Sequence, residues 1–161
     1  MAFDAFLKLS GIEGESGDSK HKNEIELLAY TFGAQQSGTA AIGGGLGAGK
    51  VSLHDLQIVK RTDKASPKLF LACCTGEHIP SATLTVRKAG TTQQDYLVLT
   101  LSDIIVSSTQ NGGSASSGDI PTETVSLNFT KIEIQYQQQS QDGTLAGTIK
   151  TGYDVKKNTK V

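Results

Sequence analysis

The feature that most limits what this chain can fold into is the recurrence of apolar residues at every second position. Ala82, Leu84 and Val86 alternate with polar neighbours, and residues 125–129 repeat the pattern further along the chain. Alternation of this kind is typical of a β-strand with one buried face, because successive side chains point to opposite sides. Comparable apolar segments lie at residues 3–9, 24–32, 51–59, 96–106 and 132–136. About seven strands separated by turn residues predict a mainly β fold.

The segment at residues 51–59 changes phase partway along. Val51 and Leu53 share one face, whereas Leu56 and Ile58 belong to the other alternation. A slip of one residue is typical of a β-bulge or of a corner at which a strand bends. We therefore expect a compact β-barrel or two packed antiparallel sheets, forming a single domain over residues 1–161.

One segment predicts a helix instead, at about residues 64–75. Ser66 is expected to cap it, Pro67 suits the first helical position, and Gly76 supplies a left-handed stop. The face expected to pack inward consists of Leu69, Phe70, Ala72 and Cys73. The sequence thus predicts one α-helix flanking the barrel.

The sequence offers no constellation that predicts catalysis. His21, His54 and His78 lie at no metal-ligand spacing with one another or with the adjacent Cys73 and Cys74, which we expect to be reduced thiols. No nucleophile elbow of the G-x-S-x-G type occurs. We therefore expect no catalytic residue, no metal site and no cofactor site, and interpret the chain as something other than an enzyme.

A glycine-rich run, GGGLGAGKVS at residues 43–52, comes close to the phosphate-binding pattern G-x-x-x-x-G-K-[ST]. Val51 occupies the position at which that pattern needs a hydroxyl, and the following residues alternate like a strand rather than beginning a helix. We therefore expect no nucleotide binding here. Residues 35–50 are interpreted as an extended glycine-rich loop, a kind of long connection that is usually functional or disordered.

The charge of the chain is small but unevenly distributed. The net charge is −1, yet residues 1–49 carry three basic and six acidic groups, whereas residues 50–90 carry seven and three. This distribution predicts either opposite poles on one particle or a randomly mixed surface. Neither the net charge nor any basic run indicates a nucleic-acid partner.

The N-terminal residues do not have the pattern of a signal peptide, and no apolar run approaches the roughly 18 residues that a membrane span needs. We therefore expect a protein that is made and folded in the cytoplasm, without membrane insertion.

Several longer runs together resemble a known family. They are FLKLSGIEGES, DSKHKNEIELLAY, GAGKVSLHD, DKASPKLFLACCTGEHI and PTETVSLNFTKIEIQY, in that order along the chain. They resemble the Hcp family, the tube protein of bacterial type VI secretion systems, which is itself similar to phage tail tube proteins. The resemblance covers nearly the whole chain.

The resemblance implies a structural role. It implies hexameric rings that stack into a tube inside a contractile sheath, with a spike protein at the tip, a baseplate, and effector proteins carried in the lumen. Such a protein assembles in the cytoplasm and is then secreted to the outside or into a target cell without a signal peptide.

The resemblance also implies that the glycine-rich loop reaches from one ring to the next, where Lys50 would meet an acidic neighbour. The candidate stacking residues are Gly38, Gly43, Gly44, Gly45, Gly47, Gly49 and Lys50. The alternative is a monomeric β-barrel that binds a small ligand, and a nucleotide-using enzyme is a third hypothesis that rests on the glycine run alone.

Overall fold

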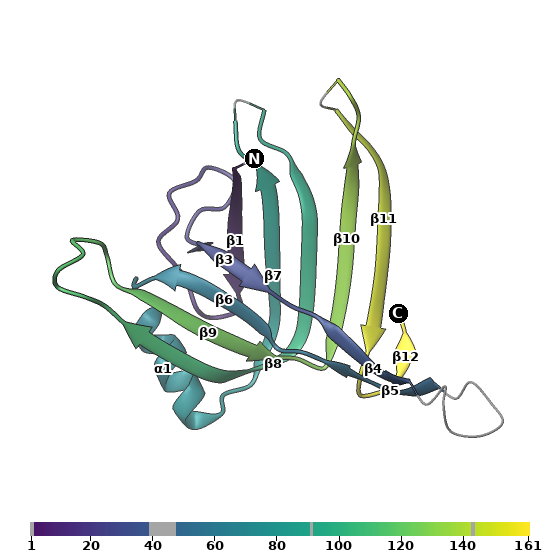
Figure 1. The fold of residues 1–161 in the computed structure, drawn as a ribbon, viewed down its shortest axis with the longest axis horizontal. Helices are drawn as coiled ribbons and strands as arrows, with labels where there is room; N and C mark the ends of the chain where they lie inside the picture. The colour runs from purple at the N-terminus through teal and green to yellow at the C-terminus, as the bar shows by residue number, and fades with distance from the viewer. Residues whose placement is uncertain (1, 39–47, 91, 143) are drawn as a thin grey trace.

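The computed structural model describes residues 2–38, 48–90, 92–142 and 144–161. The elements are β1 (Phe3–Leu9), β2 (Ile25–Leu27), β3 (Ala29–Thr31), β4 (Ala34–Gly38), β5 (Ala48–Leu53), β6 (Leu56–Arg61), α1 (Ser66–Thr75), β7 (Ile79–Lys88), β8 (Asp95–Gly112), β9 (Thr122–Asn128), β10 (Lys131–Gln139), β11 (Leu145–Asp154) and β12 (Thr159–Lys160). The predicted mainly β fold with one flanking helix is confirmed (Figure 1).

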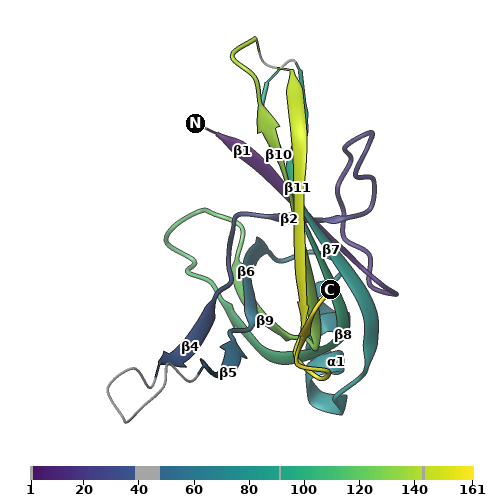
Figure 2. The same ribbon diagram turned by 90° about the vertical axis from the view of Figure 1, so that its right-hand side faces the viewer.

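Antiparallel pairing closes the strands into a barrel. Strand β7 pairs with β1 and β8, β8 pairs with β9, β9 with β6, and β6 with β3. Strand β2 precedes β3 directly and pairs back with β1, and between them the backbone N–H of Leu28 donates to the carbonyl of Val59 at 2.7 Å. Figure 2 shows β6, β9, β8 and β7 curving around the barrel.

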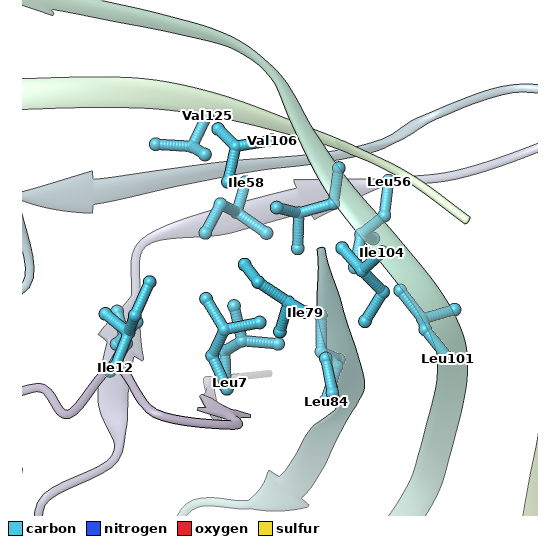
Figure 3. Packing of buried hydrophobic residues seen from close by; sticks show 14 of the residues in the cluster. Leu7, Ile12, Leu56, Ile58, Ile79, Leu84, Leu101, Ile104, Val106 and Val125 are labelled. Atoms are coloured by element: carbon cyan, nitrogen blue, oxygen red, sulfur yellow. The ribbon is translucent and has the colours of Figure 1, made fainter. Parts of the chain in front are cut away.

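The core fills this barrel with the apolar side chains that the alternation predicted. Leu84 and Leu99 face each other across β7 and β8, and both are fully buried. Ile58 and Val125 make an equivalent pair on β6 and β9 (Figure 3). The strand predictions at residues 82–86 and 125–129 are therefore confirmed.

Strand β8 is long enough to belong to both sides of the barrel. Its first half pairs with β10, up to Ser102, and its second half pairs with β9 from Ile105 onward. Between them Asp103 has a φ of 53°, in the left-handed region that Asp tolerates better than most residues. This single residue marks the corner at which the strand changes partners.

The sequence segment at 24–32 divides in two. The chain bends at Leu28, so β2 pairs with β1 whereas β3 pairs with β6. The prediction of one continuous strand here is wrong because barrel closure requires the chain to switch partners. The phase change predicted within 51–59 is confirmed, since β5 ends at Leu53 and β6 begins at Leu56.

Helix α1 differs from its prediction at two points. Ala65, not Ser66, takes the N-cap position, because the Ser66 hydroxyl is used elsewhere: it accepts from the backbone N–H of Asp63 at 3.0 Å. Phe70 is 60% exposed, because the helix contacts the barrel along a narrow stripe of Ala65, Leu69 and Ala72 at the spacing i, i+4, i+7. Gly76 ends the helix at a φ of 66°, as predicted.

A three-stranded extension, β10–β11–β12, continues the sheet beyond the barrel (Figure 1). Strand β10 pairs with β8, and β11 lies outside it. Residues 145–151 of β11 are all exposed, so neither face of this strand is covered. Since it does not bury one face, β11 has no strict alternation of apolar residues, and the sequence did not predict it.

Candidate functional site

The first candidate surface is a hairpin that projects from the barrel. Among the described residues, strands β4 and β5 pair only with each other and form a separate two-stranded sheet (Figures 1 and 2). Gln35 pairs with Ser52 and Gln36 with Val51, and the register shifts between Gln36 and Gly38. A hairpin therefore replaces part of the long loop that was expected at residues 35–50.

Gly49 is fixed in this hairpin by a close backbone approach. A Cβ at this position would lie 2.6 Å from Oγ and 2.7 Å from the carbonyl oxygen of Ser37, distances that real Cβ atoms do not show. The glycine thus lets the two strands approach where the register shifts.

The predicted stacking residues are only partly placed. Gly38 ends β4, and Gly49 and the exposed Lys50 belong to β5. The residues Gly43, Gly44, Gly45 and Gly47 lie outside the described part of the chain. Gly38, Gly49 and Lys50 therefore lie on the two strands of the hairpin, toward the end that is farther from the barrel.

The second candidate surface is the extension formed by β10 and β11. Its register places Tyr136 beside Leu97 on one side and Ile149 on the other. All three side chains lie on the face that continues the barrel core, yet Tyr136 is 44% and Ile149 68% exposed. An apolar stripe thus runs out of the core onto the molecular surface.

A buried charge network, which the sequence did not predict, ties α1 to the barrel. Lys60 is fully buried, and its Nζ donates to Glu123, to Asp63 Oδ1 at 2.8 Å and to the Arg61 carbonyl at 2.9 Å. Glu123 also accepts from Ser66 Oγ at 2.7 Å and from Asn111 Nδ2 at 2.6 Å. The network therefore joins β6, β8, β9 and the N-terminus of α1.

A second network holds the connection between β1 and β2, residues 10–24, against the sheet. Arg87 is almost fully buried, and its Nη1 and Nη2 both donate to the carboxylate of Asp18. The carboxylate of Asp4 lies 3.3 Å from Nη2 of Arg87. His21 stacks on Phe6 at a centroid distance of 4.5 Å. The connection is thus a fixed part of the fold.

The contact with Arg87 lowers the pKa of Asp18. Hydrogen bonds from the Arg87 guanidinium, and then from the backbone N–H of Lys20, hold the pKa of the Asp18 carboxyl well below its ordinary value of 3.8. Because the folded-state pKa is depressed, the stabilisation is present above pH 3.8 and is lost as the pH falls below it.

We expect Asp18→Asn to flatten the pH dependence of stability in acid. The wild-type free energy of unfolding should fall more steeply than that of the variant between about pH 5 and pH 2. In this range the Asp18 carboxyl of the wild type binds a proton on unfolding, whereas the asparagine of the variant does not. Urea titrations across this range measure it, with the exposed Asp119→Asn as control. Parallel curves for the wild type and Asp18→Asn would contradict the assignment.

The histidines and cysteines of the chain were not expected to form a metal site. Within the described ranges, no group of three His, Cys, Asp or Glu side chains could hold a metal ion. Cys73 is partly buried against the core and Cys74 is exposed, both as free thiols. None of the helical residues that the structure describes belongs to a helix long and apolar enough to cross a bilayer.

Known proteins match both this sequence and this geometry. A family model described as "Type VI secretion system effector, Hcp" matches residues 6–136. Protein hcp1 of Pseudomonas aeruginosa is 44% identical over 162 residues, which cover 99% of each chain.

Solved structures agree. Hcp1 from Salmonella typhimurium is 42% identical and covers 100% of both chains with a TM-score of 0.83. A structure described as a type six secretion system protein is 32% identical, covers 99% of this chain and 100% of its own, and has a TM-score of 0.95. The chain therefore belongs to the Hcp family of type VI secretion proteins, as its sequence motifs indicated.

Proposed function

We propose that copies of this chain close into hexameric rings that stack into the inner tube of a type VI secretion system. A contractile sheath on a baseplate then propels the tube, which is tipped by a spike protein and carries effector proteins in its lumen. The observation that carries the proposal is strand β11 at the outside of the extension, because its residues 145–151 are exposed on both faces and gain burial only from a partner chain.

The extension offers what a lateral ring contact needs. In the described residues the outer edge of β11 is bonded only from Gly152 onward, by β12 and the backbone N–H of Val161, so residues 145–151 present an unpaired edge. Unpaired edges are sites of strand addition, which monomeric proteins usually block. A closed ring joins one patch to a different patch on its neighbour. One of the two patches consists of the edge of β11 together with the apolar stripe of the extension, formed by Tyr136 of β10 and Ile149 of β11.

The hairpin offers what a joint between rings needs. A lone two-stranded hairpin is marginally stable in water, so β4 and β5 gain most from a partner that covers them. Its residues Gln35, Gln36 and Lys50 are exposed and polar, which suits a contact that forms and separates. We assign ring stacking to residues 38–50, with Lys50 facing an acidic group of the next ring.

The same proposal assigns the chain a structural role without catalysis. Assembly would take place in the cytoplasm and secretion would follow through the apparatus itself. Effectors would be bound in the lumen of the ring rather than in an enclosed pocket.

Replacing Ile149 with aspartate tests the lateral contact. We expect the concentration at which rings half dissociate to rise by about tenfold or more, because the change places a carboxylate in the apolar stripe. Sedimentation velocity over a concentration series measures this.

The matched control is Thr148→Asp, which adds the same charge to the opposite face of the same strand. Weak dissociation in this control and strong dissociation in Ile149→Asp would support the apolar stripe as the contact. Equal behaviour of the two variants would contradict it.

A further inference from the structure

We infer that a cavity between the β1–β2 connection and α1 binds an acidic segment of a partner protein. The cavity has a volume of about 630 Å³. Its walls carry the side chains of Lys8 from β1, Lys20 and Lys22 from the connection, and Lys68 from α1. This inference is independent of ring formation.

The cavity concentrates positive charge in an acidic part of the chain. Residues 1–49 contain three basic side chains, and all three, Lys8, Lys20 and Lys22, line this one cavity. Each lysine at the cavity is exposed, and none forms an ion pair with a carboxylate among the described residues. Four ammonium groups that form no ion pair outnumber the two carboxylates of the lining, Glu13 and Glu24, and favour an anionic occupant.

The two acidic residues of the lining contact other side chains and form no ion pair with these lysines. Glu24 accepts a hydrogen bond from His21 Nδ1 at 3.0 Å, which directs it toward the buried side of the connection. Glu13 lies 3.7 Å from Lys64, a lysine outside the cavity. The two carboxylates of the lining therefore already have partners of their own.

The connection holds two of the lysines in place before anything binds. The Asp18 carboxylate accepts hydrogen bonds from the backbone N–H groups of Lys20 and His21 and from the guanidinium of Arg87. Because His21 points inward onto Phe6, its neighbours Lys20 and Lys22 are left at the surface. Such preorganisation reduces the entropy that binding would otherwise cost.

The chemistry of the walls favours carboxylates over nucleic acid. Among the described residues that line the cavity there is no aromatic side chain on which a base could stack and no arginine fork for a phosphate. Lysines are point charges on flexible stems, which suit carboxylates spaced along an extended peptide.

An octaglutamate peptide, labelled with a fluorophore, is the probe for this site. At low ionic strength we expect it to bind the full-length protein, and Lys20→Glu combined with Lys22→Glu should weaken binding by about tenfold or more. The matched control is Lys156→Glu combined with Lys157→Glu, which makes the same charge change in another exposed turn and should weaken binding less than about twofold. Fluorescence anisotropy measures both.

Carbodiimide crosslinking then locates the peptide, since it joins carboxylates to lysines in direct contact. We expect crosslinks to Lys8, Lys20, Lys22 and Lys68. Lys8→Glu with Lys68→Glu changes the opposite walls and should give a comparable loss. Equal weakening by the control pair, crosslinks located elsewhere, or tighter binding of a single-stranded oligonucleotide to the same lysines would each overturn the inference.

Discussion

Lys60→Met is expected to lower the free energy of unfolding by about 3 to 5 kcal/mol, the range found when one partner of a buried ion pair is removed. The change preserves the volume and the aliphatic stem but leaves the buried carboxylate of Glu123 without its cation, and Asp63 loses the same partner. Urea denaturation at several protein concentrations measures the effect, since assembly also contributes to apparent stability.

Two further variants make this prediction specific. The exposed Lys157→Met controls for the loss of a lysine and should change stability by less than about 0.5 kcal/mol. Adding Glu123→Gln to Lys60→Met should restore part of the loss, because the second change removes the unpaired charge. A loss below about 1 kcal/mol for Lys60→Met would show that the network does not hold α1 to the barrel.

Shortening the β4–β5 hairpin is expected to abolish tubes while leaving hexamers intact. The register permits a clean design: Gln36 remains opposite Val51, and Asn-Gly joins Ser37 directly to Lys50 in place of residues 38–49. Stacking is lost because the shortened hairpin no longer reaches the next ring. Native mass spectrometry counts the copies, and electron microscopy and a secretion assay report on tubes.

Two outcomes would contradict the role of the hairpin. If the shortened protein were monomeric, residues 38–49 would belong to the lateral contact instead. If it formed tubes and secreted normally, the hairpin would have no part in stacking. Lys50→Glu in the full-length hairpin is a milder variant that keeps the loop and changes only its charge.

The barrel strands could be predicted because each buries one face. At Leu56 and Ile58 the apolar positions recur with period two, and both side chains are fully buried. Strand β11 could not be predicted in this way, because exposure on both faces removes any selection for alternation. The prediction that Phe70 packs inward is wrong for a related reason: helical spacing gives the direction of a side chain but not the width of the buried stripe.

The positions of Lys60 and Glu123 in their strands indicate burial, although both side chains are charged. Lys60 falls in phase with Leu56 and Ile58, and Glu123 falls in phase with Val125 and Leu127. The two residues are direct partners in the register of β6 and β9. A lysine and a glutamate that both occupy buried positions of neighbouring strands predict a buried ion pair, provided that the pairing of the strands is known. Pairing between strands far apart in sequence does not follow from alternation.

The stacking residues show the same limit. A glycine-rich run indicates a connection with unusual backbone geometry or close backbone approach, and Gly49 shows the close approach, to Ser37. The run does not by itself reveal that residues on either side of it pair as β4 and β5. That pairing depends on Gln36 and Val51, whose polar and β-branched side chains carry no distinctive signal.

The mass of the purified protein in native mass spectrometry tests the central proposal most directly. The closed ring predicts a dominant species of about six times the 16.9 kDa chain mass, with the same number of copies across protein concentrations. A protein that remains at 16.9 kDa at every concentration would contradict it and favour the monomeric barrel.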